Sequence, residues 1–216
     1  VEAGVPVSVA QDEANQVGLR LPIDLASSDS ATIGGILATN AGGVLTVAYG
    51  NARSLVLGIE AVLADGRIWN GLSTVRKDNT GYALKDLMVG SEGTLGLITA
   101  ATLSLVQAPK VSATAWLGVQ SVDDALSVLA AVRQALPDHL RAFELIPALA
   151  VDLVVKFRQA QGLSTRPILG EALPWQVLIA VDSADAQAEL EERLMSCLMA
   201  IYETGLIRDV VVSQSE

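Results

Sequence analysis

Gly90-Ser91-Glu92-Gly93-Thr94-Leu95-Gly96-Leu97-Ile98 holds three glycines within its first seven residues. A second glycine-rich stretch lies upstream, Ala31-Thr32-Ile33-Gly34-Gly35-Ile36-Leu37-Ala38-Thr39-Asn40-Ala41-Gly42-Gly43. Residues without side-chain bulk leave backbone amides open to a ligand, so both stretches predict close approach of the backbone to a bound group. Taken alone, residues 31–43 favour ordinary glycine-rich turns between strands over a ligand-binding loop.

The glycine spacing in residues 31–43 differs from the common dinucleotide and phosphate loops, and no Gly-Lys-Ser/Thr follows it, so a nucleoside triphosphate is not expected. Between the two stretches lies Arg76-Lys77-Asp78-Asn79-Thr80-Gly81-Tyr82-Ala83-Leu84-Lys85. Its Asp-Asn-Thr-Gly turn is of the kind stiffened by side-chain to backbone hydrogen bonds. A structural role in positioning the next segment is therefore favoured over catalysis, and a plain solvated loop is the alternative.

These runs, in this order and spacing, resemble the flavin-binding domain of the FAD-linked oxidases of the vanillyl-alcohol oxidase, or PCMH-type, superfamily. The branch they resemble holds the D-lactate, glycolate and D-2-hydroxyglutarate dehydrogenases. The resemblance is strong over residues 1–108 and weak beyond them. It implies non-covalently bound FAD and the oxidation of a small D-2-hydroxy acid to the 2-oxo acid, with hydride transfer to the flavin.

The resemblance also implies which residues contact the cofactor. Residues 30–43 correspond to a flavin-contacting segment, Gly50 to a position near the isoalloxazine, and Gly93 and Ile98 to the adenosine end of FAD, with Glu92 holding the turn. The expected cofactor-binding residues are Ser30, Thr32, Ile33, Gly34, Gly35, Thr39, Asn40, Ala41, Gly42, Gly50, Glu92, Gly93 and Ile98. No catalytic residue and no metal ligand is expected, since His139 is interpreted as a loop residue and Cys197 as a buried thiol.

Composition narrows the classes of partner. The net charge of −10 and the pI of about 4.5 argue against nucleic acid and anionic membrane surfaces. One cysteine cannot form an internal disulfide, and the sequence shows neither a secretory signal pattern nor a long apolar run, so a cytoplasmic location without a transmembrane segment is expected. Apolar residues make up 51% of the chain although aromatic residues make up only 4%. This surplus predicts that the rest of its own polypeptide, or a homologous subunit, covers part of the surface.

Sequence patterns predict an α+β chain in two parts that meet near Pro109. Residues 1–108 are expected to form the second subdomain of a PCMH-type FAD-binding domain, a mixed sheet with flanking helices. Residues 31–43 and 90–98 should lie side by side at one edge of it, because a dinucleotide site needs its amides to converge on one ligand. Residues 109–216 alternate between strand and helix patterns, which predict helices on one face of an antiparallel sheet, and the resemblance implies that they form part of a cap or substrate domain.

Local signals place the individual elements. Ser8-Val9-Ala10-Gln11 fits a capping box that opens a short helix ending at Gly18. Residues 31–43 fit neither helix nor strand, because the glycines interrupt both patterns. The other expected elements are strands over residues 55–64, 67–69, 97–106, 111–119, 143–146, 175–181 and 209–212, a hairpin turn at Asp65-Gly66, and helices after Ser121, over residues 148–159 and around residues 190–201.

Some of the family's functional parts do not occur among these residues. The family carries an upstream glycine-rich loop for the FAD pyrophosphate and downstream catalytic and metal-binding histidines, which have no counterpart here. We therefore expect a fragment of an FAD-dependent 2-hydroxy-acid dehydrogenase that is inactive by itself and holds FAD weakly or not at all. The alternatives are a non-catalytic flavin-binding or assembly subunit of a multi-subunit glycolate-oxidase-like complex, and a structural remnant without a ligand.

Overall fold

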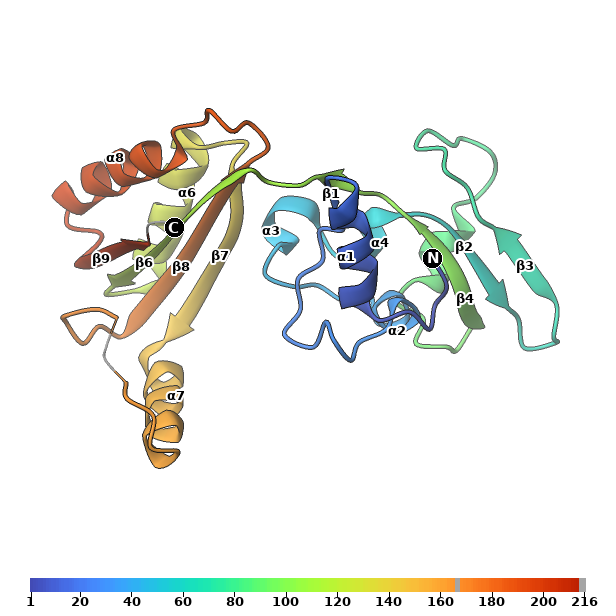
Figure 1. The fold of residues 1–216 in the computed structure, drawn as a ribbon, viewed down its shortest axis with the longest axis horizontal. Helices are drawn as coiled ribbons and strands as arrows, with labels where there is room; N and C mark the ends of the chain where they lie inside the picture. The colour runs from blue at the N-terminus through green and yellow to red at the C-terminus, as the bar shows by residue number, and fades with distance from the viewer. Residues whose placement is uncertain (166–167, 214–216) are drawn as a thin grey trace. The chain divides into compact units, whose positions relative to one another are not determined.

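The computed structural model describes residues 1–165 and 168–213. The chain divides into two compact units, Val1–Ala108 and Pro109–Glu216. Helices and antiparallel sheets occur in both units, so the predicted α+β class is confirmed (Figure 1). The elements of the first unit are α1 (Val7–Gln16), β1 (Leu19–Arg20), α2 (Ile33–Ala38), α3 (Thr46–Tyr49), α4 (Ala52–Leu55), β2 (Val56–Val62), β3 (Ile68–Gly71), α5 (Leu84–Met88), β4 (Leu97–Leu103) and β5 (Val106–Gln107).

The main sheet of the first unit has the strand order β3-β2-β4, and a short ribbon pairs β1 with β5. All of these pairings are antiparallel within the described residues, so the sheet is not the mixed one that was expected. The tight turn at Asp65-Gly66, where Gly66 has a φ of +83° and reverses the chain beside β2, accounts for the antiparallel pairing of β2 with β3. Residues at the start of the chain add a further antiparallel bridge to β4, between Glu2 and Ala100.

Two helix starts differ from the local sequence signals. The prediction of a capping box at Ser8 is wrong, because α1 begins at Val7 with Pro6 as its N-cap. The Ser8 amide donates instead to the Ser28 carbonyl. Residues 31–43 were expected to be irregular, but they contain α2, whose N-cap Thr32 accepts a hydrogen bond from the Gly35 amide. Burial of Ile33, Ile36 and Leu37 on one face outweighs the helix-weakening effect of the two glycines.

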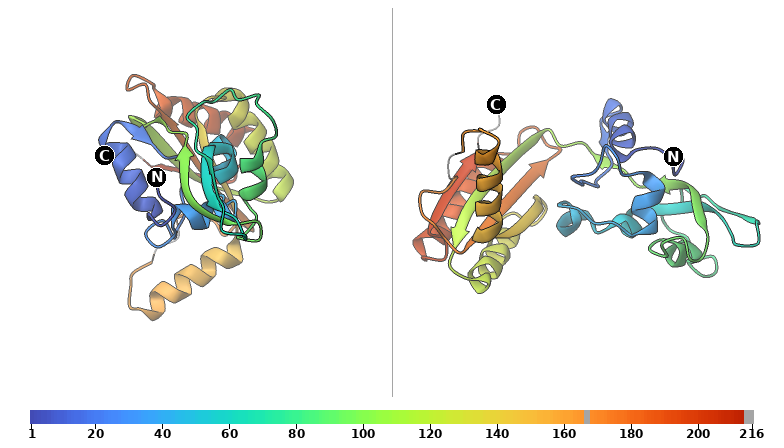
Figure 2. Two further views of the ribbon diagram at one scale, coloured as in Figure 1. Left: turned by 90° about the vertical axis from the view of Figure 1, so that its right-hand side faces the viewer. Right: turned by 90° about the horizontal axis from the view of Figure 1, so that it is seen from below.

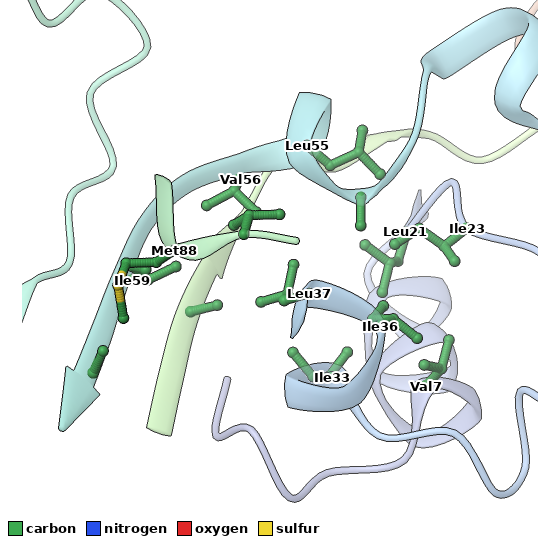
Figure 3. Close-up of a cluster of buried hydrophobic side chains, with 14 residues drawn as sticks. Val7, Leu21, Ile23, Ile33, Ile36, Leu37, Leu55, Val56, Ile59 and Met88 are labelled. Carbon is green, nitrogen blue, oxygen red and sulfur yellow. The ribbon is translucent and has the colours of Figure 1, made fainter. Parts of the chain in front are cut away.

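A single buried cluster fixes α2 within the first unit. In Figure 3, Ile33, Ile36 and Leu37 of α2 lie among side chains from α1, β2 and the end of α5. The labelled members of the cluster are Val7, Leu21, Ile23, Ile33, Ile36, Leu37, Leu55, Val56, Ile59 and Met88. Because these apolar side chains lock α2 against the sheet, the residues at both of its ends have defined positions.

The second unit contains β6 (Val111–Val119), α6 (Val122–Ala135), β7 (Leu140–Pro147), α7 (Ala148–Ala160), β8 (Trp175–Ser183), α8 (Leu190–Glu203) and β9 (Asp209–Ser213). Its antiparallel sheet has the order β7-β8-β6-β9. Helices α6 and α8 lie together on one face of this sheet, and α7 extends away from it (Figures 1 and 2). The predicted arrangement of helices on one sheet face is therefore confirmed for α6 and α8, as is the N-cap of α6 at Ser121.

Two features are absent from the described residues. None of the helices in the described ranges has the length and apolar character that a membrane span requires. Within the same ranges, no three or more His, Cys, Asp or Glu side chains are grouped so that they could hold a metal ion.

Candidate functional site

The two glycine-rich stretches meet in the first unit. We call residues 31–43 the first glycine segment and residues 90–98 the second. The Gly90 amide donates to the Leu37 carbonyl at 2.9 Å, and the Glu92 amide donates to the Ala38 carbonyl at 2.9 Å. The prediction that these segments lie side by side, although about fifty residues separate them in the sequence, is confirmed.

A hollow of about 370 Å³ lies between the two segments. Its lining residues are Ala3, Gly4, Thr32, Gly34, Gly35, Ala38, Ser91, Gly93, Gly96, Leu97 and Ile98. None of these side chains is ionisable, and most are small, so the polar groups that a ligand could meet there are backbone groups and the hydroxyls of Thr32 and Ser91. The volume falls within the range of small-molecule sites, which suits one portion of a dinucleotide.

Free backbone donors line this hollow. Within the described ranges, the amides of Gly4, Gly93 and Gly96 make no hydrogen bond to a protein acceptor. Glu92 and Gly93 have φ angles of +51° and +78°, and in this turn the Glu92 amide donates to the Ala38 carbonyl and the Thr94 amide to the Ser91 carbonyl. The Gly93 amide between them keeps its donor, and a phosphate oxygen is a suitable acceptor for such a backbone amide.

Glycine is required at Gly34, Gly43 and Gly93 for two different reasons. A Cβ on Gly34 would lie 2.7 Å from the Ala3 Cβ, and one on Gly43 would lie 2.1 Å from the Asp24 carbonyl oxygen. Both positions are therefore small because another part of the protein lies against them. At Gly93 the nearest atom to an added Cβ is the Leu97 Cδ2 at 3.8 Å, so the positive φ is what favours glycine there.

Only part of the predicted set faces the hollow. Of the expected cofactor-binding residues, the structure places Thr32, Gly34, Gly35, Gly93 and Ile98 in its lining. Outside it lie Ser30, Ile33, Thr39, Asn40, Ala41, Gly42, Gly50 and Glu92.

Several of the residues outside the lining have structural contacts that explain their places. The Ile33 side chain is fully buried in the core, so it cannot face a ligand. The Thr39 hydroxyl donates to the Gly35 carbonyl at 3.0 Å, and the Asn40 Oδ1 accepts the Arg53 amide at 2.9 Å. The Thr39 and Asn40 side chains thus stabilise the backbone of the first glycine segment by hydrogen bonds within the protein.

The lining also contains residues that the sequence analysis did not select. These are Ala3, Gly4, Ala38, Ser91, Gly96 and Leu97. Gly96 and Leu97 belong to the quoted second segment, so its glycine spacing could have identified them. Ala3 and Gly4 enter through a long-range contact, because the Ala3 amide donates to the Thr99 carbonyl at 2.9 Å. No local pattern in the first residues signals that pairing.

A larger hollow of about 750 Å³ lies elsewhere in the first unit, bounded by β2, β3 and residues 73–86. It is lined by charged and aromatic side chains, among them Arg53, Arg76, Lys85 and Trp69. Residues 76–82 show the predicted turn: Asp78 Oδ1 accepts the Thr80 amide at 2.9 Å, and these Thr80 hydrogen bonds lower the pKa of Asp78. The Arg76 guanidinium donates to the Ser104 hydroxyl at 3.1 Å, which ties this loop to the end of β4. The smaller hollow is the better candidate for a cofactor, because the two glycine segments form it.

Comparison with known proteins relates this geometry to a family. Residues 1–71 match the family described as FAD binding domain, a range that includes the first glycine segment and ends before the second. The chain is 39% identical over 193 residues to the mitochondrial D-2-hydroxyglutarate dehydrogenase of Danio rerio, covering 89% of this chain and 35% of that protein. It is 34% identical over 216 residues to a putative mitochondrial D-lactate dehydrogenase of Schizosaccharomyces pombe, covering 100% of this chain and 40% of that protein.

One bacterial protein and two solved structures are also similar to this chain. The D-2-hydroxyglutarate dehydrogenase of Xanthomonas citri pv. viticola is 35% identical over 216 residues, covering 100% of this chain and 44% of that protein. An alkyldihydroxyacetonephosphate synthase superimposes with a TM-score of 0.70 at 17% identity, covering 100% of this chain and 42% of that chain. A VAO-type flavoprotein from Myceliophthora thermophila C1 superimposes with a TM-score of 0.59 at 19% identity, covering 100% of this chain and 36% of that chain.

At these identities the two structures establish a shared fold and nothing more. The chain spans less than half the length of each dehydrogenase relative named above. Its first glycine segment falls within the matched FAD binding domain, and the similarity to the dehydrogenases extends across both units. Residues 1–71 therefore match the FAD binding domain family, and the chain as a whole is similar to a part of the D-2-hydroxyglutarate and D-lactate dehydrogenases.

Proposed function

We propose that this chain provides part of the FAD site of a dehydrogenase that oxidises a D-2-hydroxy acid to the 2-oxo acid. The observation that carries the proposal is the meeting of the two glycine segments around a hollow where, within the described ranges, the amides of Gly4, Gly93 and Gly96 have no protein acceptor. The names of the curated relatives, D-2-hydroxyglutarate and D-lactate dehydrogenases, support the class of substrate.

The hollow fits one portion of FAD by its chemistry. The amides of Gly4, Gly93 and Gly96 would hold phosphate oxygens, and the hydroxyls of Thr32 and Ser91 offer further donors. The apolar side chains of Leu97 and Ile98 offer a surface for a flat ring. Although the net charge is −10, no carboxylate is among the residues that line the hollow.

When bound, FAD supplies the hydride acceptor of the reaction. The residues of this hollow would bind and orient the cofactor, because none of them can take up a proton near neutral pH. The base that removes the hydroxyl proton of the substrate must then come from outside the hollow. In the relatives, more than half of each polypeptide lies outside the region that this chain matches.

The lack of an ionisable side chain in the hollow also favours a second candidate function. A non-catalytic flavin-binding or assembly subunit of a glycolate-oxidase-like complex would need the cofactor-binding residues and no proton acceptor. The two candidates differ in one measurable property, which is reduction of the bound flavin by a 2-hydroxy acid.

The experiment uses the complete gene product, purified and examined for a flavin absorption spectrum before and after added FAD. We expect bound FAD, and we expect it to be bleached without oxygen by one of D-2-hydroxyglutarate, D-lactate and glycolate. The L-enantiomers of the two chiral acids are the controls. Bound flavin that none of these acids reduces would support the non-catalytic subunit instead. A protein that takes up no FAD would refute both candidates.

Two glycines provide a matched pair of variants for the site. Gly93 and Gly66 have φ angles of +78° and +83°, and an added Cβ meets nothing closer than 3.8 Å at Gly93 and nothing within 4 Å at Gly66. Gly93→Ala and Gly66→Ala should therefore cost similar stability, while only Gly93→Ala alters the hollow. Equal flavin retention by the two variants would argue against this hollow as the FAD site.

A further inference from the structure

Arg53 connects the two glycine segments from outside the hollow. Its Nη2 donates to the Val89 carbonyl at 2.6 Å, and Val89 is a fully buried residue directly before the second segment. Its backbone amide donates to the Asn40 Oδ1 at 2.9 Å, near the end of the first segment. One residue at the start of α4 therefore holds both segments by hydrogen bonds.

Gly90 leaves the space that the Arg53 side chain occupies. A Cβ on Gly90 would lie 2.9 Å from the Arg53 Nη2 and 3.2 Å from the Asn40 Cβ. Gly90 also has a φ of +84°, and its amide donates to the Leu37 carbonyl at the end of α2. The guanidinium, Asn40 and Gly90 are thus packed at one point where α2, α4 and the second segment meet.

The chemistry of this contact favours a fixed geometry. A guanidinium is planar and permanently charged, and its hydrogen bonds to carbonyl oxygens are stronger than those between neutral groups. Among the described residues, the ion pairs of the chain involve Arg67, Lys85 and Arg141 and not Arg53. Among the described residues, no carboxylate forms an ion pair with Arg53 and so competes with the Val89 carbonyl for its guanidinium.

We propose that Arg53 is a positioning residue that sets the separation of the two glycine segments, and through it the affinity for FAD. Arg53 lines the larger hollow and not the smaller one, so it acts on the cofactor site through the backbone of residues 89–93. This inference rests on the proposed binding of FAD at the hollow.

Three variants of the complete gene product test the role. Arg53→Met keeps the unbranched stem of the side chain and removes its donors, Arg53→Lys keeps a cationic donor, and Arg67→Met removes a guanidinium at the β2–β3 turn, where Arg67 pairs with Asp65. FAD is stripped and titrated back, and the visible circular dichroism of the bound flavin is recorded. We expect the Kd for FAD to rise about tenfold in Arg53→Met, a loss of about 1.4 kcal/mol.

The Arg53→Lys variant should recover most of this affinity and the parental dichroism spectrum, and Arg67→Met should match the parent. If Arg53→Lys is as weak as Arg53→Met, or if Arg53→Met binds FAD like the parent, the proposed role is wrong.

A double-mutant cycle with Gly90→Ala gives a second test. The added Cβ should displace the guanidinium, so Arg53→Met should cost little further FAD affinity in the Gly90→Ala background. Fully additive losses would overturn the packing on which the inference rests.

Hydrogen exchange separates this inference from the proposed function. If the parent protein binds no FAD, the proposed function fails, but the Gly90 and Glu92 amides can still be measured. Faster exchange of these amides in Arg53→Met, and not in Arg67→Met, would support the positioning role, and unchanged exchange would refute it.

Discussion

Replacing Gly34 with alanine should destabilise the first unit by displacing the beginning of the chain. The new Cβ would lie 2.7 Å from the Ala3 Cβ and 3.2 Å from the Ala3 carbonyl oxygen. Ala3 has little room to move, because its amide donates to the Thr99 carbonyl at 2.9 Å and its carbonyl accepts the Gly34 amide at 2.8 Å. The substitution therefore forces apart two segments that are hydrogen-bonded to each other.

The magnitude follows from two opposing effects. Alanine in place of glycine within a helix is favourable by about 1 kcal/mol. Inserting a methyl group into a close-packed contact costs roughly 1–3 kcal/mol. The sum is a net loss of about 1 kcal/mol for Gly34→Ala. Gly35→Ala is the matched control, since the only close atom to its Cβ is the Thr32 Oγ1 at 3.2 Å, and it should leave stability unchanged or raise it.

Urea unfolding measures both variants, with hydrogen exchange and mass spectrometry following peptides from residues 1–108. Tryptophans in both units, Trp69 in the first and Trp116 and Trp175 in the second, would mix the two transitions in a fluorescence measurement. Ala3→Gly removes one of the two crowded methyl groups, so the double variant Ala3→Gly with Gly34→Ala should recover most of the loss. If Gly34→Ala is as stable as Gly35→Ala, the close contact with Ala3 does not exist and the reasoning is refuted.

Three further predictions concern single side chains. Glu92 is exposed with a φ of +51°, so Glu92→Gly should stabilise the first unit by up to about 1 kcal/mol in urea unfolding, and a loss would contradict the left-handed backbone. The pKa of Asp78 is lowered by its hydrogen bonds to Thr80, so the order of this turn should persist above the ordinary aspartate pKa and be lost as the pH falls through the lowered value. The Thr80 amide resonance followed against pH would show this, and a midpoint at or above the ordinary aspartate value would count against it. Cys197 is half-buried and not fully buried as predicted, and this partial burial raises the pKa of its thiol. Iodoacetamide should therefore modify the folded protein more slowly than free cysteine at neutral pH, and equal rates would contradict this.

The sequence by itself determined the features that depend on neighbouring residues. The hairpin turn at Asp65-Gly66, the N-cap at Ser121 and the alternation of strands and helices after Pro109 all appear in the structure where their local patterns predicted them. Turn chemistry, capping and hydrophobic periodicity act over a few residues, so one sequence reveals them. The two glycine segments were found for the same reason.

Only the tertiary structure decided what each glycine does. Gly34 is small because Ala3 lies against it and Gly90 because Arg53 does, while Gly93 lines the hollow. The helix α2 was likewise missed, because its stability comes from burial against α1 and β2 and not from its glycine-rich sequence. These properties depend on contacts between residues far apart in the chain. The space beside a glycine, which decides whether a larger side chain would fit, is defined only when folding brings those residues together.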